Sequence, residues 1–239
     1  MSQRHAQRFW DEAARENALF FVDNRLDYRD PDLDRLWAGG VEAVDSMLGA
    51  VGLTVAPEDV VVEIGCGVGR LTRVLAERAA RVVALDISAE MLDRARELNP
   101  QLENVEWRHG DGASLAGVPE ASADGCFSHV VFQHIPDPAV TLTYVREMGR
   151  VLRPGGWSVF QLSTAPVHHR PGDLRGRVAW RARALLRRGP RRQEHPAWLG
   201  SCVSVEELGA AAAAGGMLVE RLVDRGTKFT TVLLRRHPA

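Results

Sequence analysis

The middle of the chain alternates between short β-branched apolar runs and longer stretches whose apolar positions have helical spacing. The run at 60–64, VVVEI, is typical of a buried parallel strand. We expect strands at 60–64, 82–86, 105–108, 125–131 and 157–162, with helices at 70–81, 89–98 and 139–152 between them. This alternation predicts βαβ units, and therefore a parallel sheet with right-handed crossovers.

Both ends of the chain depart from this alternation. We expect further helices at 3–21, 32–51 and 205–214, and further strands at 217–223 and 228–234. Pro31 suits the start of the second helix, because proline is tolerated in a first helical turn. A tight turn at 224–226 would join the last two strands into an antiparallel hairpin, which is a distinctive end for a parallel sheet.

The loop after the first predicted strand is rich in glycine and is preceded by an acid. Its sequence, EIGCGVG at 63–69, has the spacing G-x-G-x-G rather than the G-x-G-x-x-G of dinucleotide sites. Glycines let the backbone turn sharply from strand to helix and approach a ligand closely. The Glu63 carboxylate would repel an anionic pyrophosphate, whereas it would attract a cationic amino group. The alternative is a tight strand-to-helix turn that binds no ligand.

Two further acids follow the second and third predicted strands. Asp86 comes 23 residues after Glu63, where a carboxylate can accept hydrogen bonds from ribose hydroxyls; alternatively, it caps the helix after Ser88. Asp111, in the sequence HGDG, could accept from an adenine amino group or form a plain Asx turn. Because ligands of open α/β sheets bind at the carboxyl ends of the strands, the three acids together indicate one ligand site.

These motifs resemble the class I S-adenosylmethionine-dependent methyltransferases. The resemblance rests on the segments 61–69, 84–88, 110–112, 131–137 and 151–157. The closing hairpin extends the likeness to the end of the chain, whereas 1–55 and 163–203 carry no motif of the family. The resemblance implies an α/β fold with a Rossmann-like seven-stranded, mostly parallel sheet, helices on both faces and a C-terminal antiparallel hairpin.

The resemblance also implies S-adenosyl-L-methionine as the cofactor. The glycine loop would pass under its methionine part, with the acid before the loop supporting the amino group. Asp86 would bind the ribose, and Ile87 and Asp111 would contact the adenine. The implied cofactor-binding residues are Glu63, Gly65, Cys66, Gly67, Gly69, Asp86, Ile87, Asp111, Gly112 and Ser128. Met91 could also pack near the adenine, although ordinary helix core is the preferred interpretation.

Methyl transfer from a sulfonium needs an enzyme to orient, desolvate and, for some acceptors, deprotonate the nucleophile. Imidazole suits the last task, and His129 and His134 follow the fourth predicted strand as candidate catalytic bases. For His134 the alternative is a loop-structuring role, which many members of the family give to a histidine there. His168 and His169 could face the acceptor or be simply solvated, and Tyr28 is a further candidate for substrate contact.

The predicted organisation is an N-terminal helical lid at 1–55 and a methyltransferase core at 56–239, with an arginine-rich insertion at about 163–203. Nine of the 29 arginines fall between Arg170 and Arg192 beside a single acid, so this segment carries +8 while the whole chain carries −1. It could be an amphipathic helix with a solvated basic face, a substrate cap for an anionic acceptor, or a nucleic-acid or membrane contact. Because the remainder of the chain is acidic, a contact with nucleic acid or a membrane is disfavoured.

The rest of the composition excludes several classes. No apolar run is long enough for a transmembrane helix, and the first residues are too polar for a secretory signal. The three cysteines are widely spaced and lack a CxxC pair, so we expect no disulfide framework, no metal and a cytoplasmic location. Lys228 is the only lysine, which we attribute to genome composition.

We therefore expect an enzyme that transfers a methyl group to a small molecule, with an oxygen nucleophile of a bacterial secondary metabolite as the preferred acceptor. Neither a membrane nor a nucleic acid is expected as a partner. Residues 129–132 lack the Asn-Pro-Pro-Tyr sequence of many enzymes that methylate base amines and amides. The alternatives are a methyltransferase that acts on RNA or a peptide through the basic insertion, and a cofactor-binding protein without transfer activity.

Overall fold

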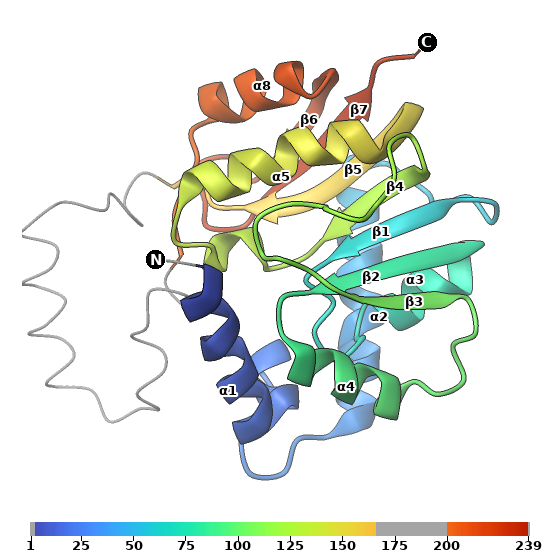
Figure 1. The fold of residues 1–239 in the computed structure, drawn as a ribbon, viewed down its shortest axis with the longest axis vertical. Coiled ribbons are helices and arrows are strands. Elements are labelled where there is room, and N and C mark those ends of the chain that lie inside the picture. Colours follow the sequence, from blue (N-terminus) through green and yellow to red (C-terminus); the bar gives the residue numbers. More distant parts are fainter. Residues whose placement is uncertain (1–2, 166–199, 239) are drawn as a thin grey trace, which may run out of the picture.

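The computed structural model describes residues 3–165 and 200–238, and these residues form one sheet covered by helices on both faces (Figure 1). The strands are β1 (Val60–Ile64), β2 (Arg81–Asp86), β3 (Val105–His109), β4 (Ala123–Ser128), β5 (Leu152–Leu162), β6 (Met217–Val223) and β7 (Thr230–Arg236). Their order is β3-β2-β1-β4-β5-β7-β6, with β1 to β5 parallel and β7 antiparallel to both of its neighbours. The predicted seven-stranded, mostly parallel fold with a closing antiparallel hairpin is confirmed.

The helices divide between the two faces of the sheet. They are α1 (Gln3–Val22), α2 (Leu33–Val51), α3 (Thr72–Arg78), α4 (Ala89–Leu98), the 3-10 turn η1 (Phe132–His134), α5 (Pro138–Val151) and α8 (Val205–Ala214). Alternate strand residues serve different cores, as the two-residue period of a strand requires. Val62 packs with α5 and α8, whereas its neighbour Val61 packs with α2 and α3.

The two N-terminal helices rest on this core through a third apolar cluster. Ala14 and Phe21 of α1 pack there with Met91 of α4 and with Val68 beside the glycine loop. The helix α1 is interrupted at Asn17, whose backbone is not helical, and the Asn17 side chain accepts a hydrogen bond from Phe20 N (3.1 Å). The helical character of this segment follows its apolar pattern, and its role as a lid stays a prediction.

Several boundaries differ from those expected. The predicted strand at 125–131 is β4 (Ala123–Ser128), because Val130 adopts a left-handed backbone (φ 54°) that takes the chain out of the sheet. The predicted helix at 70–81 is shorter, and Arg81 already belongs to β2. The last strand begins at Thr230 rather than at Lys228, so Lys228 belongs to the turn before β7.

Candidate active site

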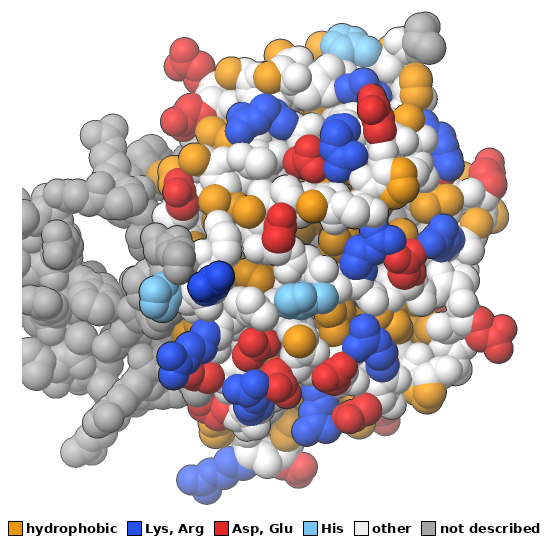
Figure 2. All heavy atoms as spheres, in the orientation of Figure 1, with side chains coloured by type: hydrophobic (Ala, Val, Ile, Leu, Met, Phe, Trp, Pro, Cys, Tyr) orange, Lys and Arg blue, Asp and Glu red, His pale blue; other side chains and the backbone are white. Residues whose placement is uncertain are grey.

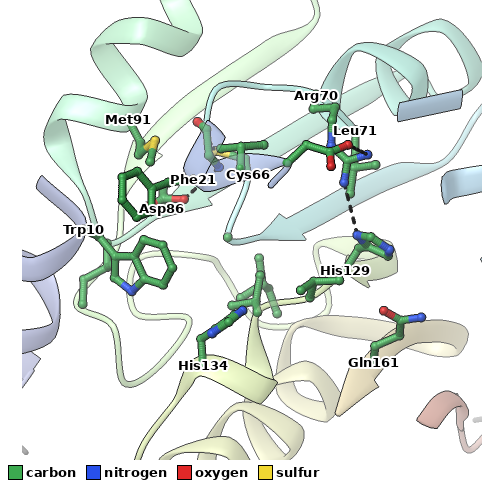
Figure 3. Close-up of a pocket in the computed structure, with 18 of the residues that line it drawn as sticks. Trp10, Phe21, Cys66, Arg70, Leu71, Asp86, Met91, His129, His134 and Gln161 are labelled. Carbon is green, nitrogen blue, oxygen red and sulfur yellow. Dashed lines mark hydrogen bonds and ion pairs between the residues drawn. The ribbon is translucent and has the colours of Figure 1, made fainter. Parts of the chain in front are cut away.

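A cavity of about 700 Å³ lies at the carboxyl ends of the parallel strands. Its wall comes from the loops after β1, β2, β3 and β4, from the end of β5, from the turn before β7, and from α1 and α2. This is the edge of an open α/β sheet at which ligands bind. Figure 3 shows Trp10 and Asp86 on one side of the cavity and His129 and Gln161 on the other.

The glycine loop forms the wall at the end of β1. Gly65 (φ 76°) and Gly67 (φ 54°) have left-handed backbones, and both line the cavity together with Cys66. A Cβ atom at Gly65 would lie 2.3 Å from Val131 Cγ2, and one at Gly67 would lie 2.7 Å from Val22 Cγ2. Gly69 does not line the cavity; a Cβ there would meet Trp107, so its role is close packing of the loop.

Asp86 joins the glycine loop to the end of β2. Its carboxylate lines the cavity and accepts hydrogen bonds from Gly67 N (2.8 Å) and Ser88 N (2.9 Å). Burial raises the pKa of Asp86 despite these two hydrogen bonds. The N-cap of α4 is Ser88, whose Oγ accepts a hydrogen bond from Met91 N. Asp86 is therefore not needed as the cap of this helix. Each carboxylate oxygen still has a lone pair for a ligand hydroxyl.

Flat and apolar side chains surround this half of the cavity. Trp10 and Phe21 of α1 lie with Met91 and Asp86 on the same side in Figure 3. Ile87 also lines the wall, and its Cδ1 would lie 2.2 Å from a Cβ at Gly112, whose backbone is left-handed (φ 72°). Met91 is both core and cavity wall. These surfaces suit a planar base beside the Asp86 carboxylate.

Asp111 lies close to the cavity without facing it. Its carboxylate accepts hydrogen bonds from Ala113 N (2.8 Å), Ser114 N (2.7 Å) and Ser114 Oγ (2.6 Å), which is an Asx turn. Partial burial opposes ionisation, but these hydrogen bonds lower the pKa of Asp111. The Asp111 side chain does not line the cavity, whereas Gly110 and Gly112 on either side do, and its contact with adenine stays a prediction.

Glu63 and Ser128 lie behind the cavity wall rather than in it. Ser128 Oγ donates to Ile64 O (2.8 Å) and ties β4 to β1. Glu63 is buried, and its Oε2 accepts a hydrogen bond from Thr72 Oγ1 (2.5 Å). Its Oε1 has no hydrogen-bond partner among the described residues. Burial raises the pKa of Glu63 from 4.5 to about 7, and support of a ligand amino group by this carboxyl stays a prediction.

The buried Glu63 carboxyl predicts a pH-dependent stability difference. Between pH 4.5 and 7 the unfolded chain ionises this group while the folded chain keeps it protonated, so folding stability falls as pH rises. Glu63→Gln removes the titration and keeps the shape. Between pH 4.5 and 8, we expect the unfolding free energy of the variant to rise by about 3 kcal/mol relative to that of the wild type. Urea unfolding of the cofactor-free proteins measures this, and a pH-independent difference would contradict it.

A buried arginine that the sequence did not single out joins several segments on the other side of the cavity. Arg70 follows the glycine motif directly, is buried, donates to Gly39 O (2.8 Å) and lies 3.7 Å from Asp23 Oδ2. Arg25 also pairs with Asp23 (2.6 Å). These residues line the cavity, but their pairing joins segments far apart in the chain, and only the position of Arg70 after the motif hinted at a role.

His129 stands against Arg70 in the cavity wall. Its Nδ1 lies 3.4 Å from Arg70 Nη2 (Figure 3). Burial, together with the charges of Arg70 and Arg25, lowers the pKa of His129 to about 4. The ring is therefore neutral at neutral pH, and when its Nδ1 accepts from Arg70 its proton is on Nε2.

His134 and Gln161 complete the polar wall. His134 lies in η1, and its ring meets Trp10 edge to face, with 5.7 Å between the ring centroids. Gln161 near the end of β5 and Lys228 and Phe229 in the turn before β7 also line the cavity. His134 was predicted at this place, whereas the other three were not, because their approach depends on the pairing of β5 with β7.

The remaining predicted site residues are Tyr28, His168 and His169. Tyr28 is not among the lining residues; it is 41% exposed, packs on Phe20 and donates to Glu16 Oε1 (2.7 Å). The turn after α1 folds back onto that helix, and the substrate contact by Tyr28 stays a prediction. His168 and His169, and the arginine-rich segment at 170–192, lie outside the described residues.

The residues present fit the cofactor that the motifs imply. The left-handed glycines let the loop pack closely against Val131 and Val22 while its backbone lines the cavity, and Asp86 has acceptor capacity for ribose hydroxyls. Within residues 3–165 and 200–238, no group of three or more His, Cys, Asp or Glu side chains could hold a metal ion. No helix in those ranges is long and apolar enough to cross a membrane.

The fold and the cavity agree with the class I S-adenosylmethionine-dependent methyltransferase architecture that the motifs resemble. Residues 62–160 match the family model described as "Methyltransferase domain", so the chain carries a domain of this family. The predicted class and cofactor are thereby confirmed at the level of the domain.

Known proteins resemble the chain over part of their length. It is 42% identical over 134 residues to a trans-aconitate 2-methyltransferase from an Azoarcus species, covering 52% of this chain and 49% of that protein. It is 35% identical over 117 residues to a malonyl-[acyl-carrier protein] O-methyltransferase from Serratia marcescens, covering 49% and 43%. The chain thus spans half or less of the length of these relatives.

A solved structure of an S-adenosylmethionine-dependent methyltransferase from Mesorhizobium loti shares the fold. Its TM-score is 0.59 at 24% identity, and the match covers 81% of this chain and 98% of that one. At this identity the likeness supports the architecture and not a common acceptor.

Proposed function

We propose that the protein transfers a methyl group from S-adenosylmethionine to an oxygen nucleophile of a small molecule. The observation that carries this proposal is a continuous cavity, which runs from the glycine loop and Asp86 to a polar wall with His134 and Gln161. Its volume of about 700 Å³ lies in the upper half of the roughly 300–1,000 Å³ typical of small-molecule sites. One cavity therefore has room for a cofactor and part of an acceptor.

The relatives support a small acceptor. By their names, one methylates trans-aconitate and another an oxygen of malonyl-[acyl-carrier protein]. Figure 2 adds that, on the face it shows, Lys and Arg side chains are interspersed with Asp and Glu side chains. A broad basic surface, as nucleic-acid binding needs, is not present among the described residues of that face. These observations favour a small molecule over RNA.

The cavity assigns roles to this chain's residues. Gly65 and Gly67 would lie against the methionine part of the cofactor, Asp86 would accept from the ribose, and Trp10 would cover the base. When bound, S-adenosylmethionine supplies an activated methyl group. His134 is our candidate for removing the acceptor proton, because an imidazole suits that task at neutral pH. His129, neutral and held against Arg70, serves instead as a hydrogen-bond donor.

The helices α1 and α2 would exclude water from the reaction. Trp10, Phe21 and Val22 of α1 and Met47 of α2 line the cavity beside the glycine loop. A closed, low-dielectric site strengthens the electrostatic contacts that orient the acceptor. This is the role of the N-terminal lid that the sequence predicts, and the cavity-lining residues of α1 and α2 support it.

Transfer of isotope-labelled methyl groups tests the proposal. The wild-type chain is incubated with S-adenosylmethionine labelled in the methyl group and with separate pools of hydroxylated small molecules, amines, RNA and peptides. We expect label in the hydroxylated pool, at an oxygen located by mass spectrometry. Label confined to RNA or peptide would contradict a small acceptor, and cofactor binding without transfer to any pool would indicate a protein without transferase activity.

A further inference from the structure

The one lysine of the chain projects from a turn that is fixed to the end of β5. Lys228 follows Thr227 in the turn before β7, and Thr227 O accepts from Thr164 N (3.0 Å). Gly226 N donates to Thr164 Oγ1 (2.7 Å), and Thr227 Oγ1 donates to Asp224 O (2.7 Å). These hydrogen bonds hold the turn in place, so Lys228 reaches the cavity from a rigid support.

The Lys228 ammonium has no acidic partner among the described residues. Burial lowers its pKa, and no neighbouring charge contributes to that shift. The two arginines that line the cavity differ, since Arg25 is ion-paired to Asp23 and Arg70 lies 3.7 Å from the same carboxylate. A half-buried cation without a counter-ion gains most when an anion binds beside it.

Two further residues that line the cavity, Gln161 and Phe229, offer groups to a ligand. Gln161 lies opposite Thr231 in the β5–β7 pairing and donates weakly to Thr231 Oγ1 (3.4 Å), but its buried Oε1 has no partner among the described residues. Phe229 is 47% exposed and lines the cavity, with its ring centroid 5.9 Å from Lys228 Nζ. A cation, an unpartnered amide oxygen and an aromatic surface therefore line the same cavity.

Resting on the proposed function, we propose that Lys228 and Gln161 form an acceptor subsite for a small hydroxylated carboxylic acid. Lys228 would pair with the carboxylate, the Gln161 oxygen would accept from a hydroxyl, and Phe229 would cover the apolar part. A carboxylate fits better than a phosphate, because one ammonium and one amide offer few donors for three phosphate oxygens. In Figure 3, Gln161 lies across the cavity from Asp86.

Because the chain has a single lysine, its side-chain amine can be observed without overlap from other lysines. Reductive methylation with ¹³C-formaldehyde keeps the positive charge and gives one ε-dimethylamine signal, separate from that of the terminal amine. The full chain, loaded with S-adenosylhomocysteine, is titrated with 4-hydroxybenzoate, 4-hydroxybenzamide and phenyl phosphate. We expect 4-hydroxybenzoate to shift the signal saturably and to bind at least tenfold tighter than the other two.

Variants separate this subsite from the cofactor site. Lys228→Met should weaken 4-hydroxybenzoate at least tenfold in calorimetry, and Lys228→Arg should restore part of that affinity. Arg225→Met, in the same turn but not lining the cavity, should change it less than twofold. S-adenosylhomocysteine affinity should stay within twofold in all three.

Two results would overturn the subsite: no shift with the acid, or equal binding of the amide or the phosphate ester. Failure of the wild type to bind S-adenosylhomocysteine would instead overturn the proposed function, so the two failures are distinguishable.

Discussion

Replacing His134 with alanine is expected to lower kcat for methyl transfer by a factor of about 10²–10⁴, the usual contribution of a positioned general base. The cofactor dissociation constant should change less than threefold, because the glycine loop and Asp86 remain intact. The expectation rests on the position of His134 in η1, where its ring lines the cavity and is held edge to face by Trp10. Single-turnover kinetics with an acceptor found by labelled transfer would measure the loss.

The matched comparison is His129→Asn. An asparagine Oδ1 can take the place of the imidazole Nδ1 and accept from Arg70, so the cavity wall is preserved. Because a pKa of about 4 makes His129 a weak base, we expect kcat of this variant to fall less than tenfold. A large loss for His129→Asn with near-normal turnover for His134→Ala would reverse the assignment, and normal turnover for both would mean that the acceptor needs no histidine base.

Asp86→Ala is expected to weaken S-adenosylhomocysteine binding more than tenfold, or about 1.4 kcal/mol or more for lost charged hydrogen bonds. The carboxylate has two tasks that the variant removes together. It holds the glycine loop through Gly67 N (2.8 Å), and it offers its remaining lone pairs to the ribose. Isothermal titration calorimetry gives the affinity, and circular dichroism checks that the variant is folded.

Asp111→Asn is the control for this prediction. The amide side chain of this variant would keep an oxygen acceptor for Ala113 N and Ser114 N, and the Asp111 side chain does not line the cavity. We expect the S-adenosylhomocysteine affinity of the variant to stay within threefold of the wild type. If Asp111→Asn weakened binding as much as Asp86→Ala, the carboxylate in the Asx turn would have to reorient toward the ligand, contrary to the geometry described.

The sequence predicted the parts of the site that depend on local backbone. The β-branched run before the glycine loop forms β1, and the glycines adopt the left-handed turns expected of a strand-to-helix junction. Asp86, His129 and His134 reach the cavity because each follows a parallel strand and such strands end at one edge. The end of β4 was misplaced because Val130 and Val131 are apolar as cavity wall, which resembles an apolar strand.

The missed residues depend on contacts between distant segments. Arg70 is fixed by Gly39 of α2 and by Asp23 after α1, about 30 and 50 residues earlier in the chain, and no local pattern encodes such a pairing. Lys228 reaches the cavity only because β7 pairs antiparallel with β5. The position of Tyr28 against α1 was not foreseen, because aromatic character alone does not show which way a turn folds.

The central claim is that the cavity at the strand ends binds the methyl donor of this domain family. Calorimetric titration of the full wild-type chain with S-adenosylhomocysteine tests it most directly. We predict saturable binding at one site per chain, weakened more than tenfold in Asp86→Ala and kept in Asp111→Asn. A wild-type chain that is folded by circular dichroism and shows no binding of S-adenosylhomocysteine or S-adenosylmethionine would contradict it.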